Sequence, residues 1–153
     1  MPLVSVIHGP NLNLLGLREP EIYGQETLET LNERLLKAAP ALGLEVEVFQ
    51  SNHEGELVER IQSARGRAEV VVLNAAGYTH SSVAIRDAVA AIRPIPTIEV
   101  HLSLPAQRES FRRRNLLEGV AKGRIEGFGG LSYLLALRAA SELIAARGNL
   151  RDQ

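Results

Sequence analysis

The stretch EVVVLNAAG, residues 69–77, decides the fold class that the sequence predicts. It is an almost continuous apolar run, which is typical of a parallel strand buried on both faces of a sheet. Apolar residues at helical spacing precede it and follow it: Leu57, Val58, Ile61 and Ala64 before, and Ile85, Ala88, Val89 and Ile92 after. The stretch therefore predicts a buried strand between two helices.

Strands and helices continue to alternate on both sides of this stretch. Further strands are expected at residues 3–7, at the period-two segment 45–49, at PTIEVHLS (96–103) and at the short GRIEGFGG (123–130). A helix is expected after a Thr27 cap, with Glu29 in its first turn. One face of this helix is predicted to be lined by Leu28, Leu31, Leu35 and Leu36. Gly43 is predicted to mark the end of the helix. The mostly apolar segment 131–148 predicts a closing helix that could also contact another subunit.

This alternation predicts a parallel sheet with right-handed crossovers. Strong central strands, with weaker second and fifth strands, favour the order 2-1-3-4-5. The expected fold is a flavodoxin-like α/β three-layer sandwich around a five-stranded parallel sheet. We expect residues 1–153 to form a single catalytic domain of ordinary size.

Composition and charge narrow the function classes. The net charge is −1 and the pI near 6.4, so no global field favours nucleic acid or an acidic membrane surface. The chain has no cysteine, which removes disulfides and thiolate nucleophiles. The N-terminus lacks a basic region and a long apolar run, so we expect neither a signal peptide nor a membrane anchor and place the protein in the cytoplasm.

Polar side chains follow three of the expected strands, where open parallel sheets bind ligands. They are Asn11, Asn13, Arg18 and Tyr23 after the first strand, Asn74, Tyr78, Thr79, His80 and Ser81 after the third, and Glu99, His101 and Ser103 at the fourth. We expect the three segments to converge on one rim. None of them has the spacing of a metal site, so no metal is predicted.

The long segment HGPNLNLLGLREPEIYG, residues 8–24, does not match a nucleotide-binding loop. Gly9 and Gly16 are seven residues apart and Leu17-Arg18 follow, so the P-loop pattern fails, as does the dinucleotide fingerprint. Flavin would suit the fold, but the segment lacks a phosphate cradle rich in Ser and Thr. Nucleotide or flavin binding is therefore a minor alternative, and a coloured or nucleotide-loaded preparation would support it.

Each candidate residue also has a simpler structural interpretation. Tyr23 could anchor a loop, His101 could be structural, and Asn74 could stabilise a turn. Arg108 and Arg112, four residues apart, could be solvated surface, and Asp87 could pair with Arg86. His8 and His53 have no visible partner and are interpreted as structural.

The combination of Arg18, Tyr23 and His101 on one rim favours a catalytic role for these residues over a purely structural one. A tyrosine with a pKa near 10 is ionised only about one part in a thousand at pH 7. One opposite charge within reach lowers a pKa by roughly 1–3 units, and arginine stays charged. Arg18 with Tyr23 is thus a plausible general base, and His101 a plausible general acid.

The sequence closely resembles type II 3-dehydroquinate dehydratase, the cofactor-free enzyme of the shikimate pathway. The resemblance covers nearly the whole chain and is carried by VSVIHGPNLNLLGLREPEIYG (4–24), NAAGYTHSSVAIRDA (74–88), IEVHLS (98–103), FRRRN (111–115) and YLLALRAA (133–140). These segments follow one another in the order and at the spacing of the family. Together they form a highly specific pattern.

The resemblance implies a role for each site residue. Tyr23 would remove the C2 proton of 3-dehydroquinate, Arg18 would lower the Tyr23 pKa, Asn11 would help to hold the enolate oxygen, and His101, oriented by Glu99, would protonate the departing C1 hydroxyl. The substrate would be bound by Asn74, His80, Leu102, Ser103 and Arg112, with Asp87 contributing to a neighbouring subunit's site. The resemblance also implies a homododecamer built from trimers, and a lid formed by the segment after the first strand.

Three departures from the family pattern concern the residues that support the site from behind, the packing between subunits and the affinity for substrate. Leu104 stands where Asn is usual, Ala106 where His is frequent, and Glu118-Gly119 replaces a pair that includes Pro. The main rival hypothesis is a non-catalytic binding module on the same fold. It predicts that Tyr23→Phe keeps ligand affinity and abolishes no activity.

Overall fold

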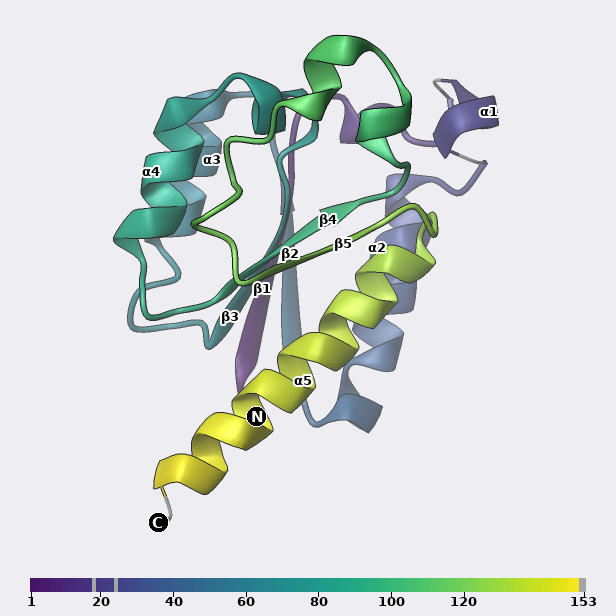
Figure 1. Ribbon diagram of the computed structural model, residues 1–153. Coiled ribbons are helices and arrows are strands. Elements are labelled where there is room, and N and C mark those ends of the chain that lie inside the picture. The colour runs from purple at the N-terminus through teal and green to yellow at the C-terminus, as the bar shows by residue number, and fades with distance from the viewer. Residues whose placement is uncertain (18, 24, 152–153) are drawn as a thin grey trace.

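A computed structural model gives the architecture of the chain (Figure 1). It describes residues 1–17, 19–23 and 25–151, and for residues 22, 23 and 151 it describes the backbone alone. Arg18 and Gly24 therefore lie outside the described residues, as does the side chain of Tyr23.

The centre of the molecule is a five-stranded parallel sheet in the order β2-β1-β3-β4-β5, which confirms the predicted topology. The strands are β1 (Leu3–His8), β2 (Glu45–Gln50), β3 (Val70–Asn74), β4 (Thr97–His101) and β5 (Gly123–Glu126). Every residue of β3 and β4 is buried, as the apolar run at 69–77 predicts for a central strand. The period-two strand β2 lies at one edge of the sheet, as expected for a half-exposed strand.

Helices cover both faces of the sheet and complete the three layers (Figure 1). The α-helices are α1 (Pro20–Tyr23), α2 (Leu28–Ala38), α3 (Glu54–Gln62), α4 (Val83–Ala91) and α5 (Leu131–Arg151). One hydrophobic core joins α2 and α5 to the sheet, and a second core joins α3 and α4 to the opposite face. Short 3-10 turns connect these elements: η1 (Leu12–Leu14), η2 (Pro40–Leu42), η3 (Ala76–His80), η4 (Pro105–Gln107) and η5 (Ser110–Arg113).

Helix α2 confirms the predicted cap and corrects the predicted face. The Thr27 hydroxyl accepts a hydrogen bond from the Thr30 backbone N–H, and Thr30 completes a capping box. Leu31 and Leu35 are fully buried, but Leu36 is 47% exposed, so its assignment to the core face was wrong. Because an α-helix turns about 100° per residue, Leu36 points away from the side that Leu35 presents to the sheet.

Two other predicted boundaries also move. Strand β1 includes His8, one residue beyond the predicted end, because His8 still pairs with Gln50 and Asn74 on its two neighbouring strands. Helix α2 ends at Ala38, and the η2 turn then leads to Gly43, whose φ of 72° suits glycine. Within the described part of the chain, no helix is both long and apolar enough to cross a membrane.

Candidate active site

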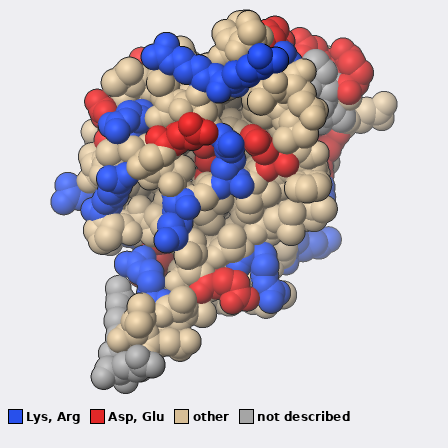
Figure 2. All heavy atoms as spheres, in the orientation of Figure 1, with Lys and Arg blue, Asp and Glu red and all other residues tan. Residues whose placement is uncertain are grey.

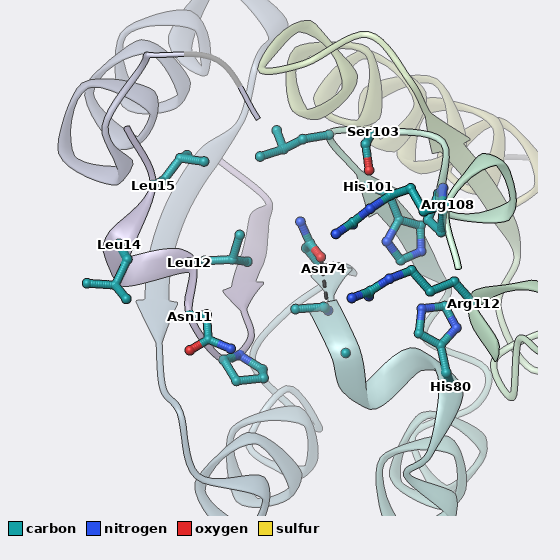
Figure 3. Close-up of a pocket in the computed structure, with 15 residues that line it drawn as sticks. Asn11, Leu12, Leu14, Leu15, Asn74, His80, His101, Ser103, Arg108 and Arg112 are labelled. Atoms are coloured by element: carbon teal, nitrogen blue, oxygen red, sulfur yellow. Dashed lines mark hydrogen bonds between the residues drawn. The ribbon is translucent and has the colours of Figure 1, made fainter. Parts of the chain in front are cut away.

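A cleft of about 700 Å³, partly open to solvent, lies at the carboxyl ends of the parallel strands (Figure 3). Three segments line it: residues 10–15 after β1, residues 74–80 after β3 and residues 101–112 after β4. Their convergence on one rim was predicted from the sequence and is confirmed. Parallel strands end at the same edge of the sheet, so segments distant in sequence meet there.

Most of the sequence-predicted site residues lie in this cleft. Its lining includes Asn11, Asn74, His80, His101, Leu102, Ser103 and Arg112. Glu99 is buried directly behind His101, whereas Asp87 lies on α4, outside the lining, where it pairs with Arg86 at 2.9 Å. Arg18 and the side chain of Tyr23, both predicted for the site, lie outside the described residues.

His101 is held by a buried carboxylate at the end of β4. Its Nε2 lies 2.5 Å from Glu99 Oε2, and the same oxygen accepts a hydrogen bond from Asn115 Nδ2 at 2.7 Å. Because an ionised carboxylate only accepts hydrogen bonds, Nε2 carries the proton and donates it. The other ring nitrogen, Nδ1, has no hydrogen bond to any residue that the structure describes, so it remains for chemistry in the cleft.

Asn74 occupies the centre of the cleft at the end of β3 (Figure 3). Its Oδ1 accepts a hydrogen bond from the Ala76 backbone N–H at 3.0 Å. The Asn74 carbonyl accepts another from the Gly9 N–H at 2.7 Å, which draws the ends of β1 and β3 together. A Cβ on Gly9 would lie 2.8 Å from the Ala75 carbonyl, so only glycine permits this approach.

Two arginines give the cleft a positive side. Figure 3 shows the side chains of Arg108 and Arg112 extending into the cleft toward Asn74. Arg112 Nε donates to Glu109 Oε2 at 2.5 Å, and this hydrogen bond is the main cause of the lowered pKa of Glu109. The lining contains no Asp or Glu among the described residues, so the cleft is suited to an anionic ligand.

Basic side chains also gather on the surface at the top of the molecule in the view of Figure 1. In Figure 2 a band of Lys and Arg crosses this end of the molecule. Arg108 and Arg112 line the cleft with side chains that are only 14% and 17% exposed, so the alternative that they are only solvated surface is wrong. Arg108 was not assigned to the site from sequence, although its place four residues before Arg112 was a usable signal.

Hydrogen bonds also orient His80 and the start of the segment after β1. His80 Nδ1 donates to the Arg114 carbonyl at 2.7 Å, which leaves Nε2 to contact a ligand in the cleft. The Asn11 N–H donates to Asn52 Oδ1 at 2.9 Å, and Asn11 adopts a left-handed φ of 69°. Asparagine tolerates this conformation better than most residues, so the sequence is locally suited to the turn.

Two of the departures from the family pattern, Leu104 and Ala106, follow β4 next to the cleft, whereas Gly119 precedes β5, where its carbonyl accepts a hydrogen bond from Arg93. Leu104 and Ala106 are absent from the described lining of the cleft, and the Leu104 side chain packs against Gly127. Among the described residues, no group of three or more His, Cys, Asp or Glu is arranged to hold a metal ion.

Comparisons with known proteins agree with this geometry. The family model for dehydroquinase class II matches residues 2–141. A 3-dehydroquinate dehydratase from Desulforudis audaxviator is 53% identical over 96% of this chain and 97% of its own length. Another, from Trichodesmium erythraeum, is 51% identical over 95% of this chain and 97% of its own length.

Solved structures give the same result. The type II dehydroquinase from Butyrivibrio crossotus is 42% identical and superposes with a TM-score of 0.88, covering 91% of this chain and 97% of that one. The type II dehydroquinase from Propionibacterium acnes is 39% identical with a TM-score of 0.89, covering 93% and 97%. By sequence and fold, this chain belongs to the class II dehydroquinase family.

Proposed function

We propose that this chain catalyses the dehydration of 3-dehydroquinate to 3-dehydroshikimate in the shikimate pathway, without a cofactor. The observation that carries this proposal is the His101–Glu99 pair in a cleft with two arginines and no described carboxylate in its lining. Family membership supports the substrate and the reaction, a hydro-lyase elimination. Such an elimination needs a base at C2, an acid at the C1 hydroxyl and donors for an enolate oxygen.

His101 is the proposed general acid. Glu99 holds the ring through Nε2, so a proton on Nδ1 can pass to the departing C1 hydroxyl. Asn115 gives Glu99 a second donor and restricts how the carboxylate can rotate. The acid is therefore oriented before the substrate arrives, which reduces the cost of reaching the transition state.

Tyr23 is the proposed general base, with Arg18 lowering its pKa. Support comes from the described neighbour Glu19, whose Oε2 lies 3.8 Å from Nη2 of Arg108 in the cleft wall. This contact brings Glu19, which lies between the two proposed residues in the sequence, to the wall of the cleft. In the proposed mechanism the segment after β1 closes over the substrate and excludes water.

The remaining assignments concern binding and assembly. Arg112 pairs with the substrate carboxylate, and the hydroxyls are bound by Asn74, His80, Leu102 and Ser103, while Asn11 helps to hold the enolate oxygen. Asp87 is exposed on α4, as a residue that reaches a neighbouring subunit's site must be. We also propose a cytoplasmic homo-oligomer, a dodecamer built from trimers.

The experiment that tests this function measures turnover. Purified, chelator-treated protein is given 3-dehydroquinate, and the ultraviolet absorbance of the enone product is followed, with borohydride in a parallel sample. We expect turnover that survives both treatments and that falls at least about 10²-fold in Tyr23→Phe. Tyr78→Phe is the matched control, because the Tyr78 hydroxyl bonds to the Asn52 carbonyl at 3.3 Å and Tyr78 does not line the cleft. A folded protein that binds 3-dehydroquinate without converting it would favour the binding module.

A further inference from the structure

Four polar side chains form a connected chain directly behind the cleft. Asn32 lies on α2, His8 ends β1, Tyr133 lies in the first turn of α5, and Asn74 ends β3. His8 is fully buried, Tyr133 is 1% exposed and Asn74 is 3% exposed. We call these residues the Asn74 relay.

The hydrogen-bond donors of the relay follow from its geometry. His8 Nε2 lies 2.8 Å from Asn32 Oδ1, an oxygen that only accepts, so Nε2 carries the proton. Burial lowers the pKa of His8 to about 4, so the ring is neutral at pH 7 and its Nδ1 is an acceptor. The Tyr133 hydroxyl lies 2.9 Å from Nδ1 and must donate to it.

The relay then reaches the cleft through Asn74. Burial raises the pKa of Tyr133, so its hydroxyl keeps its proton, while a side-chain interaction with Asn74 has the smaller, opposite effect on that pKa, which is the direction expected when an Asn74 N–H donates to the phenol oxygen. Asn74 Oδ1 is already bonded to the Ala76 N–H at 3.0 Å. With the oxygen held by Ala76 and one N–H held by Tyr133, the second N–H of the amide is left for the ligand in the cleft.

We infer that Tyr133 and His8 are positioning residues for the proposed dehydration, acting through Asn74. They hold the Asn74 amide so that it presents a donor, and never its carbonyl, to an oxygen of the substrate. An amide free to rotate would present its oxygen part of the time and would bind that substrate oxygen more weakly. This inference rests on the proposed function, but the relay itself is a property of the described residues.

A double-mutant cycle tests the inference with 3-dehydroquinate as the probe. Tyr133→Phe removes the hydroxyl, and we expect KM to rise about tenfold while kcat changes less than about threefold. In an Asn74→Ala background, the same change should alter kcat/KM less than about twofold, because the group through which Tyr133 acts is gone. An equal loss in both backgrounds would show a purely structural role and would overturn the inference.

Further variants keep the test decisive if Tyr133→Phe folds poorly. His8→Leu leaves the Tyr133 hydroxyl without its acceptor, whereas His8→Gln keeps one donor and one acceptor. We expect the KM defect in His8→Leu and its recovery in His8→Gln, and the same defect in both would contradict the relay. Tyr78→Phe, whose hydroxyl lies outside the relay, should leave KM unchanged.

An ¹⁵N NMR spectrum of the histidine rings separates failure of the relay from failure of the proposed function. We expect His8 to be protonated on Nε2 at pH 7, with the Nδ1 signal shifted by Tyr133→Phe. A proton on Nδ1 in the wild-type protein would overturn the relay whatever the turnover. A wild-type protein with no turnover would instead overturn the proposed function, and with it the assignment of these residues to the reaction.

Discussion

The two walls of the cleft are built in different ways. The strand wall, formed by the residues at the ends of β3 and β4, is buried and hydrogen-bonded: Asn74 is 3% exposed, His101 is 6% exposed and Glu99 is 1% exposed. The segment wall, formed by residues 10–15 after β1, passes directly into exposed apolar residues. Within this wall Leu14 is 41% exposed, although Leu12 and Leu15 are buried, and Leu17 just beyond it is 79% exposed.

This difference teaches how the two halves of the proposed reaction are prepared. The acid lies on the strand wall, where the sheet and the Glu99 carboxylate orient it before substrate binds. The proposed base lies on the continuation of the segment wall, which contacts the opposite side through Glu19 and Arg108 at 3.8 Å. We therefore expect changes in the strand wall to affect chemistry strongly, and changes in the segment wall to affect closure more modestly.

The largest effect is expected from Glu99→Gln on the strand wall. The neutral amide keeps the size of the side chain but removes the charged acceptor shared by His101 and Asn115. We expect kcat to fall about 10³-fold, with KM within about threefold, in steady-state assays. A kcat near that of the wild type would mean that Glu99 does not orient the acid.

The second effect concerns the pH dependence of stability beneath the strand wall. The pKa of His8 is lowered from 6.5 to about 4 by burial, so the unfolded chain binds this proton more readily than the folded one. The free energy of unfolding should therefore fall as the pH drops from about 6.5 to about 4, by roughly 3 kcal/mol from this group. Chemical denaturation across this range measures the fall.

His8→Gln should remove this part of the pH dependence, because glutamine does not titrate. The exposed His53→Gln is the matched control, which should show the same fall as the wild type. If His8→Gln retains the full slope between pH 6.5 and 4, the buried neutral histidine is not its source.

The smallest effect is expected from Gly16→Ala at the base of the segment wall. Gly16 has a φ of +87°, and an added Cβ would lie 2.9 Å from the Gln25 carbonyl. We expect about 1–2 kcal/mol of lost stability, seen by thermal denaturation, with a fall in kcat/KM of only a few-fold.

Gly43→Ala provides the comparison for Gly16→Ala. Gly43 also has a positive φ, of +72°, but an added Cβ meets nothing within 4 Å. It should lose about 1 kcal/mol and no activity. Equal activity in the two variants would contradict a role for Gly16 in closing the segment over the cleft.

The sequence by itself determined the strand and helix order and most of the cleft. Apolar runs such as 69–77 and the period-two segment 45–49 reflect local backbone geometry, so they predicted the central and edge strands correctly. Because parallel strands end at one edge, residues such as Asn74 and His101 could be assigned to a common site from their places after strands.

Only the tertiary structure decided which side chains meet across long sequence separations. His8 and Tyr133 are 125 residues apart, and nothing local to either predicts that they form a hydrogen bond. Tertiary packing likewise decides that Arg108 lines the cleft and that Leu36 faces solvent. Backbone periodicity sets the elements, but the angle at which each helix or loop packs on the sheet decides which atoms come within bonding distance.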